Sequence, residues 1–150
     1  MKTKTIKFPV INSFTDEYAF LSNFYESWIT DEDVWNYPTV EHYFQCMKTI
    51  NMIERHKIIF AATPQEAKKL GRKCTLISNW EDIKVQIMYD GLMMKYTQNE
   101  NLADKLKATG NAYLIEGNCW KDTFWGYDIN LKMGKNMLGQ LLMDIRKKIK

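Results

Sequence analysis

The sequence predicts a mainly α-helical α+β fold, a single compact helical domain over residues 1–150 with a small N-terminal β element. Three observations predict it. A chain of 150 residues has the usual length of one domain and can bury its own core. It carries no internal repeat, low-complexity segment or Pro/Gly/Ser-rich linker at which a second domain would begin. Strand-like patches occur only in the N-terminal third, and the remainder shows helical periodicity with capping signals.

The first elements are two short strands and a helix. We expect the strands at Thr5–Phe8 and Trp28–Thr30, where extended patches occur. The first helix should begin at Val40, because Pro38 favours an extended residue before it and Thr39 is a good N-cap. Its buried stripe follows the i, i+3, i+4, i+7 spacing and comprises Val40, Tyr43, Phe44 and Met47.

The later helices are marked by their caps. Thr63, Pro64 and Glu66 form a capping box with proline at the first helical position, and Gly71 ends that helix. A second capping box, Ser78 to Glu81, opens a long helix. Its broad apolar face comprises Ile83, Val85, Ile87, Met88, Leu92 and Met94. The last predicted elements are a short helix with Leu102 and Leu106 that ends at Thr109-Gly110, an extended piece at Ala112–Glu116, and a terminal helix with its stripe over Met137–Ile149.

The composition is that of an ordinary globular protein, with 45% hydrophobic and 26% charged residues. No apolar run approaches the ~18 residues that span a bilayer, and the basic N-terminus lacks the apolar segment of a signal peptide. We therefore expect a cytoplasmic protein without a membrane partner. Cys46, Cys74 and Cys119 are scattered and lack metal-ligand spacing, which favours free thiols and leaves a catalytic Cys–His pair open.

The net charge of +3 is unevenly distributed along the chain. From Phe8 to Met47 there are seven acidic residues and no Lys or Arg, whereas six basic residues face one acid from Leu131 onward. Two interpretations of the basic end are open, namely a solvated helix terminus or a side that receives a phosphorylated substrate. The total charge is too small to indicate nucleic-acid binding by itself.

Glu41 is the leading candidate for a functional residue, because it lies in the first turn of a predicted helix beside aromatic side chains. Gln45 and Lys48 share its helix face. The positive end of the helix dipole favours the ionised carboxylate, which could act as a base or stabilise developing positive charge. Alternatively, Glu41 only complements the dipole, and on spacing alone this second interpretation is the more common one.

Further polar and aromatic residues lie where a simple core does not require them. Each also has a structural explanation as a turn, a cap or the cover of a core edge. These residues are Ser22 and Asn23 between aromatics, Arg72 at a helix end, Trp80 with Lys84 one turn later, Asp122 three residues before Trp125-Gly126, and Asn136 before the last helix.

Taken together and in this order, these motifs closely resemble the NADAR (YbiA-like) family over nearly the full chain. The matching segments are Phe20-Leu21-Ser22-Asn23-Phe24, Thr39-x-Glu41-His42-Tyr43-Phe44-Gln45, Thr63-Pro64 with Ala67 and Lys68, Leu70-Gly71-Arg72, Trp80 with Lys84 and Met88, Asp122-x-x-Trp125-Gly126, and Gly134-Lys135-Asn136-x-Leu138-Gly139-x-Leu141-Leu142-Met143-x-Ile145-Arg146.

The resemblance implies a YbiA-like fold and an N-glycosidase, a hydrolase that cleaves the bond between a ribose C1′ and a nitrogen. One branch of the family is associated with ribosylamino-pyrimidine phosphates of riboflavin synthesis, and another removes ADP-ribose from guanine bases of DNA. By motif match, the catalytic residues of the family fall on Glu41, Trp80 and Asp122. The segment Tyr127–Met133 is bulkier than the glycine-rich stretch common in the family, which affects substrate choice more than chemistry.

The residues suit these roles. Glu41 and Asp122 could divide acid and base work, as paired carboxylates do in glycosidases. Trp80 and Trp125 offer faces on which a base can stack. The remaining substrate-binding candidates are Lys48, Arg72 and Lys84 for the 5′-phosphate, and Asn23 and Asn136 for ribose hydroxyls.

We therefore predict an N-glycosidase that needs no cofactor or metal and acts on a phosphorylated N-riboside. The alternatives are removal of ADP-ribose from guanine in DNA, and a non-catalytic ADP-ribose or NAD-binding module. The retention of both acids argues against the binding module, because a pure binder of anionic phosphates has little need for two carboxylates. The sequence makes no prediction of the oligomeric state.

Overall fold

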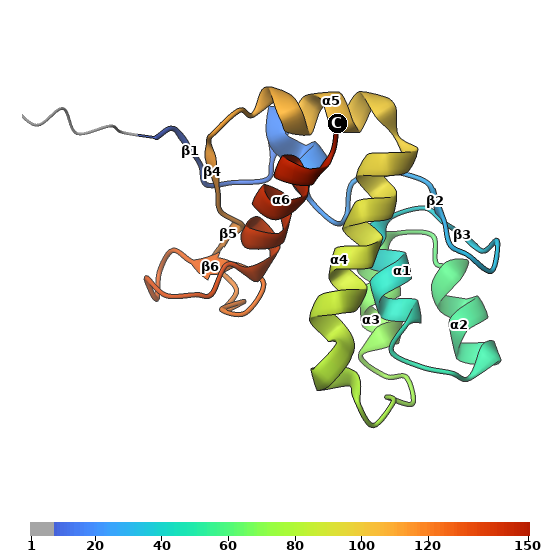
Figure 1. Ribbon diagram of the computed structural model, residues 1–150. Coiled ribbons are helices and arrows are strands. Elements are labelled where there is room, and N and C mark those ends of the chain that lie inside the picture. The colour runs from blue at the N-terminus through green and yellow to red at the C-terminus, as the bar shows by residue number, and fades with distance from the viewer. Residues whose placement is uncertain (1–7) are drawn as a thin grey trace, which may run out of the picture. The chain divides into compact units, whose positions relative to one another are not determined.

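The computed structural model describes residues 8–150, which form two compact units. One unit comprises Ser22–Ala103, and the other combines the N-terminal segment up to Leu21 with Asp104–Lys150. Helix α5 (Glu100–Ala108) runs from one unit into the other. The elements of each unit can be followed by colour in Figure 1. Within the described residues, no helix combines the length and the apolar character needed to cross a bilayer.

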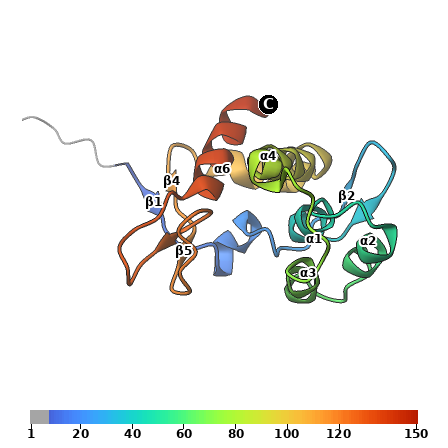
Figure 2. The ribbon, with the colours of Figure 1, turned by 90° about the horizontal axis from the view of Figure 1, so that it is seen from below.

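The Ser22–Ala103 unit is built around helix α1 (Val40–Cys46). Figure 2 shows α1 between α2 (Met52–Ile59), α3 (Pro64–Gly71) and α4 (Trp80–Gln98). Every residue of α1 is buried, so this short helix forms the centre of the unit's core. A Cβ on Gly91 would lie 2.8 Å from the Tyr43 ring, which shows how closely α4 approaches α1.

A β-hairpin completes this unit. Strand β2 (Ile29–Thr30) pairs antiparallel with β3 (Asn36–Tyr37), so that Ile29 lies opposite Tyr37. The Gln98 side chain at the end of α4 donates to the Thr30 carbonyl and accepts from the Thr30 amide, each at 2.8 Å. The hairpin is therefore held to α4 by hydrogen bonds between the Gln98 side chain and the Thr30 backbone.

The second unit holds two parallel strand pairs and the terminal helix. Strand β1 (Val10–Ile11) pairs with β4 (Tyr113–Leu114), and β5 (Gly117–Asn118) pairs with β6 (Tyr127–Asp128). Helix α6 (Met137–Lys148) packs on β4, and its Leu138, Leu142 and Ile145 side chains are fully buried. A 3₁₀ helix, η1 (Asp16–Leu21), ends the N-terminal segment.

The predicted fold class, mainly helical with few short strands, is confirmed. The Thr39 and Thr63 caps are present, since their hydroxyls accept from the amides of His42 and Glu66, each at 3.1 Å. The extended piece at Ala112–Glu116 appears as β4. Of the predicted first strand, Thr5–Lys7 lie outside the described residues and Phe8 is not in a strand. The second predicted strand appears as β2.

Three expectations need correction. The strands are not confined to the N-terminal third, because β5 and β6 form in the Trp-Gly region. Helix α4 begins at Trp80 and its N-cap is Asn79, so Ser78 is not the cap. The Asn79 side chain makes no capping hydrogen bond. Helix α2 was not predicted at all, although Asn51 caps it by accepting from the amides of Ile53 and Glu54.

The buried face of α4 also differs from the predicted one. It runs through Met88, Gly91, Leu92, Lys95 and Tyr96, whereas Ile83, Ile87 and Met94 are only half-buried. Lys95 is completely buried, and its Nζ atom donates to the Ser22 carbonyl at 2.9 Å. The rings of Tyr25 and Tyr96 lie 5.8 and 5.2 Å from its Nζ atom. The buried face was predicted from apolar residues alone, so this prediction could not include a lysine.

Burial lowers the pKa of Lys95 to about 7, which makes stability depend on pH. Between this value and the unfolded pKa of about 10.4, the unfolded chain binds a proton that the folded chain lacks. Stability should therefore rise with pH, by at most about 1.4 kcal/mol per pH unit from this group. We expect urea unfolding at pH 7.5 and 9.0 to show this gain in the wild type and not in Lys95→Met. Parallel pH dependences of the two proteins would contradict it.

Candidate functional site

The candidate site centres on Glu41 in the first turn of α1. Thr39 caps the helix, and the Glu41 amide donates to the Asn23 carbonyl at 3.2 Å, which fixes the start of α1 against the Ser22–Tyr25 segment. The Glu41 residue is only 6% exposed. Its Oε1 atom accepts from Gln45 Nε2 at 2.7 Å, while its Oε2 atom accepts no hydrogen bond from the described residues. Oε2 is therefore the atom left for a substrate or water.

The surroundings of Glu41 act on its charge in opposite directions. Burial raises the pKa of the carboxyl above its ordinary value, and this is the larger effect. The hydrogen bond from Gln45 lowers it, followed by the positive charges of Lys68, Lys48 and Arg72. The sequence had indicated only the helix dipole, which favours ionisation. The structure adds a desolvation cost that outweighs the hydrogen bond and the charges, so the net direction of the pKa of Glu41 is upward.

Gln45 is held beside Glu41 by a close approach between two helices. A Cβ on Gly71 of α3 would lie 1.9 Å from Gln45 Oε1, so any other residue here would require the Gln45 amide to move. The Oε1 atom of Gln45 is buried and has no hydrogen-bond donor among the described residues. Space made by Gly71 therefore lets the amide turn its Nε2 atom toward the carboxylate.

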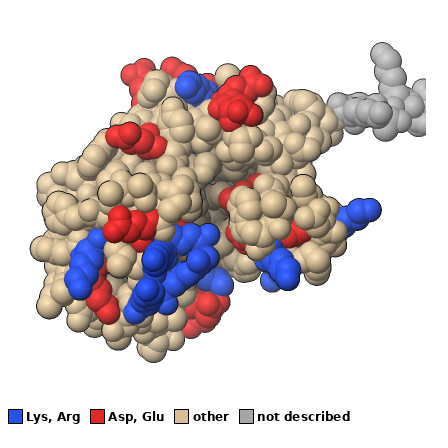
Figure 3. Space-filling view, turned by 180° about the vertical axis from the view of Figure 1, so that it is seen from behind, with Lys and Arg blue, Asp and Glu red and all other residues tan. Residues whose placement is uncertain are grey.

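Cations approach Glu41 from two elements. Lys48 follows the end of α1, Lys68 lies on α3, and Arg72 is the C-cap of α3. Figure 3 shows Lys and Arg side chains gathered on one part of the surface, and α3 with its C-terminal end carries Lys68, Lys69, Arg72 and Lys73. Burial lowers the pKa of Lys48, and Glu41 opposes that shift. This arrangement is suited to an anion held close to a carboxyl group.

Aromatic rings line the same region. Lys48 Nζ lies 5.7 Å from the Phe44 ring centre and 5.9 Å from that of Trp80, and these two rings are 5.0 Å apart. Lys68 Nζ lies 5.9 Å from the Phe24 ring. Trp80 is 5% exposed and packs against Phe44, which agrees with a packing role at the start of α4. Its role as a catalytic or stacking residue stays a prediction.

Asn23 and Lys84 have contrasting surroundings. Asn23 is buried, its Nδ2 atom donates to Met88 Sδ at 3.3 Å, and its Oδ1 atom has no donor among the described residues. An unused buried acceptor beside Glu41 suits the predicted contact with a ribose hydroxyl. Lys84 instead forms an ion pair with Glu81 one turn earlier on α4. A phosphate contact by Lys84 has to compete with this pair and stays a prediction.

Three predicted site residues belong to the other unit, where each has a structural role. The Asp122 Oδ1 atom accepts from the amides of Phe124 and Trp125 at 3.2 and 2.9 Å. The ring of Trp125 packs edge-on against Phe124 at 4.8 Å. The Asn136 Oδ1 atom accepts from the Glu116 amide at 2.9 Å, and its Nδ2 atom donates to the Leu114 carbonyl at 2.8 Å. That these residues share a site with Glu41 stays a prediction.

The sequence interpretation missed Lys68 and the amide of Gln45 as members of the site. Spacing offered a signal for both, because Gln45 lies one turn after Glu41, and Lys68 lies one turn before Arg72.

His42, next to Glu41, uses both ring nitrogens for hydrogen bonds within the fold. Its Nε2–H donates to the Ala61 carbonyl at 3.0 Å, so Nδ1 accepts from the Thr39 hydroxyl at 2.8 Å. Across residues 8–150, no three His, Cys, Asp or Glu side chains gather as metal ligands.

Comparison with known families finds a match over almost the whole chain. The model of the NADAR domain family matches residues 11–150, a stretch that includes both units. The residues on which the family resemblance was predicted all lie within this range.

Individual relatives agree with this match. The N-glycosidase YbiA of Shigella boydii is 38% identical over 139 residues, which cover 91% of this chain and 85% of that protein. The riboflavin biosynthesis protein VVA0006 of Vibrio vulnificus is 35% identical over 89% of this chain, a region that makes up 36% of that longer protein. The NMR structure of the E. coli protein YbiA superposes with a TM-score of 0.83 at 36% identity, covering 95% of this chain and 86% of that one.

Proposed function

The chain belongs to the NADAR family and is an N-glycosidase, and from this premise we propose that it hydrolyses the N-ribosyl bond of a phosphorylated riboside. One observation carries the choice of substrate class. The buried Glu41 carboxyl lies within the field of Lys48, Lys68 and Arg72, a combination that suits a sugar carrying an anionic phosphate. Relatives from Vibrio vulnificus and Zea mays are named riboflavin biosynthesis proteins, which supports a ribosylamino-pyrimidine phosphate as the first substrate to test.

In this proposal Glu41 is the leading catalytic residue. Breaking the C1′–N bond leaves positive charge on the sugar, and the free Oε2 atom of an ionised Glu41 would stabilise it. Water then forms the new C1′–O bond and gives up a proton, while the departing nitrogen takes one up. A carboxyl with a raised pKa is suited to accept the proton from water. Asp122 is the second acid predicted from the family motif.

The other residues would bind the substrate. Lys48, Lys68 and Arg72 would hold the 5′-phosphate, and the open Oδ1 acceptor of Asn23 would take a ribose hydroxyl. Trp80 or Trp125 would stack against the base-like group. The cations have a second effect, because bound phosphate would neutralise them and thereby raise the proton affinity of Glu41 further.

Mass spectrometry of products tests the proposal. The full chain would be incubated in parallel with a ribosylamino-pyrimidine phosphate, its dephosphorylated form and ADP-ribosylated DNA. We expect ribose 5-phosphate from the first substrate and much slower cleavage of the second. Cleavage of the ADP-ribosylated DNA alone would assign the DNA substrate, and absence of cleavage with retained binding would indicate a binding module.

Gln45→Met should shift the pH profile of the reaction. Methionine has a similar length but no amide donor, so the Glu41 carboxyl loses the hydrogen bond that lowers its pKa. We expect the acid limb of kcat/KM to move upward by about one pH unit. The matched control is Gln65→Met, at an exposed position of α3, which should leave the profile in place. If activity falls but the acid limb of kcat/KM does not move, Gln45 has only a packing role.

A further inference from the structure

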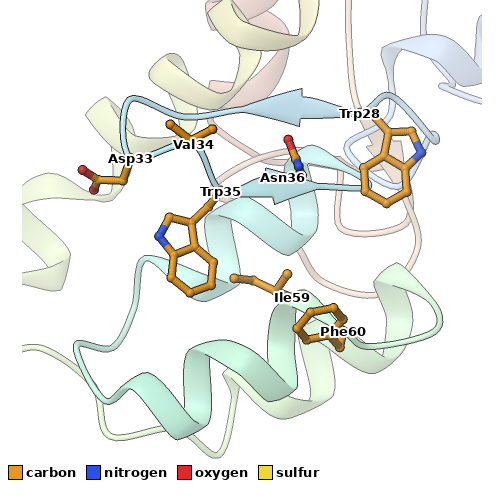
Figure 4. Close-up of a pocket in the computed structure, with 7 residues that line it drawn as sticks. All are labelled: Trp28, Asp33, Val34, Trp35, Asn36, Ile59 and Phe60. Atoms are coloured by element: carbon orange, nitrogen blue, oxygen red, sulfur yellow. The ribbon is translucent and has the colours of Figure 1, made fainter.

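A pocket unrelated to the Glu41 site lies between the β2–β3 hairpin and the C-terminal end of α2. Its volume is about 410 Å³, and Figure 4 shows the side chains that surround it. The lining residues are Trp28, Asp33, Val34, Trp35, Asn36, Ile59 and Phe60. None of the predicted site residues is among them, and all seven belong to the Ser22–Ala103 unit. The pocket is therefore separate from the Glu41 site, and its ligand need not be the substrate.

Large apolar side chains around this pocket are exposed to solvent. Trp28 is 56% exposed, and Val34 and Phe60 are each 77% exposed. Ile53, two helical turns before Phe60 on the same face of α2, is 70% exposed. Exposed apolar side chains thus occur on α2 on both sides of Lys57, farther from the pocket than one small molecule would reach. Surfaces of this kind commonly mark sites of protein–protein contact.

The charge of the pocket is opposite to that of the Glu41 site. Asp33 is its one ionised lining residue, and the adjoining exposed acids are Glu26 and Glu32. No Lys or Arg occurs between Phe8 and Met47, so the hairpin side carries only negative charge. On the α2 side, Lys57 is exposed and His56 contacts the rings of Trp35 and Phe60. A cationic group is therefore favoured on the hairpin side of the pocket and an apolar group on the α2 side.

The hairpin wall is held in place without a ligand. The Asp31 carboxylate accepts from the Trp35 amide at 2.9 Å and from the Tyr37 hydroxyl at 2.7 Å. The Trp35 ring packs edge-on against His56 with ring centres 5.3 Å apart. Gln98 fixes the opposite strand through Thr30. A pre-formed wall lowers the entropic cost of binding, because few side chains have to be ordered.

We propose that this pocket is the docking site of a partner polypeptide that inserts an arginine side chain at the Trp35 and Asp33 end of the hairpin and an apolar side chain toward Trp28. A guanidinium group stacks on indole faces and pairs with a carboxylate, which are the two chemistries that the hairpin wall offers. An apolar residue next to the arginine would cover Ile59 and Phe60. Aromatic residues and arginine dominate the centres of protein interfaces, which agrees with such an anchor.

NMR titration of the full chain tests this proposal. The probes are the peptide acetyl-Leu-Arg-Leu-amide and the same peptide with citrulline, which has the shape of arginine without its charge. Among the five tryptophan indole signals, we expect those of Trp28 and Trp35 to move with the arginine peptide. The citrulline peptide should bind about twofold to fivefold more weakly, which corresponds to the range of a cation–π contact at an exposed site.

Two surface variants complete the test. Asp33→Asn should weaken binding of the arginine peptide and leave citrulline binding unchanged, and Phe60→Ser should weaken both. Neither variant should alter kcat or KM of the N-glycosidase reaction, so the outcome is independent of the proposed substrate. Equal binding of the two peptides, movement of other tryptophans, or no movement at millimolar peptide would overturn the proposal. Concentration-dependent shifts without peptide would instead assign the face to a second copy of the chain.

Discussion

Glu41→Gln should lower kcat by about 10³-fold while leaving KM and the fold nearly unchanged. Glutamine keeps the size of the side chain, and its amide oxygen can still accept from Gln45 Nε2. It removes the negative charge that would stabilise the sugar cation and the basic oxygen that would take a proton from water. Replacing a buried carboxyl that pays a desolvation cost should not reduce stability. Steady-state kinetics with a thermal melt of each protein measures both parts.

Glu100→Gln is the matched control for this prediction. Glu100 is also a glutamate in a first helical turn, but it is exposed on α5 and makes only the dipole interaction that any such residue makes. Its substitution should leave kcat unchanged. If Glu41→Gln turns over at the wild-type rate in a folded protein, Glu41 has only the dipole role, and the catalytic carboxylate must be sought at Asp122.

Asn136→Ala should destabilise the protein by about 2–4 kcal/mol. Asn136 is 6% exposed, and both ends of its amide bond to backbone groups of β4 and the residues after it. Alanine removes both of these hydrogen bonds, and the Leu114 carbonyl that loses its donor belongs to a fully buried residue. The residue also has a φ of 50°, a left-handed conformation that asparagine tolerates better than alanine. Urea unfolding would measure the loss.

Two further variants separate stability from binding. Asn136→Asp keeps the acceptor and loses the donor, so its stability should fall between those of the wild type and Asn136→Ala. Asn130→Ala, at an exposed position, should have almost no effect. A stable Asn136→Ala protein with a raised KM would restore the predicted contact of Asn136 with ribose and refute the structural role.

Helix starts were predictable where a side chain caps the backbone directly. Thr39 and Thr63 are local signals, because the capping hydroxyl and the amide it accepts from are three residues apart. Helix α2 escaped prediction since it is short and only weakly amphipathic, with Arg55, His56 and Lys57 interrupting its apolar residues. The α4 face was misplaced because Lys95 is buried by a tertiary partner, the Ser22 carbonyl, that periodicity does not contain.

The site shows the same division between local and tertiary information. The sequence pointed to Glu41 and to the shared face with Gln45, because both follow from one turn of helix. The desolvation of Glu41 and the position of Lys68 depend on how α3 lies against α1, which no local pattern contains. The roles of Asp122 and Asn136 in backbone bonding likewise emerge only from the folded loops.

The close approach of Gly71 to Gln45 also has an evolutionary consequence. A mutation that adds a side chain at position 71 places an atom on the Gln45 amide, so that amide has to move unless residue 45 is smaller. A smaller residue 45 in turn gives up the hydrogen bond to Glu41. A change at either position therefore disturbs the same hydrogen bond, which couples the two positions. A deep mutational scan should show positive epistasis at this pair, with substitutions at position 71 better tolerated on a Gln45→Ala background than on the wild type.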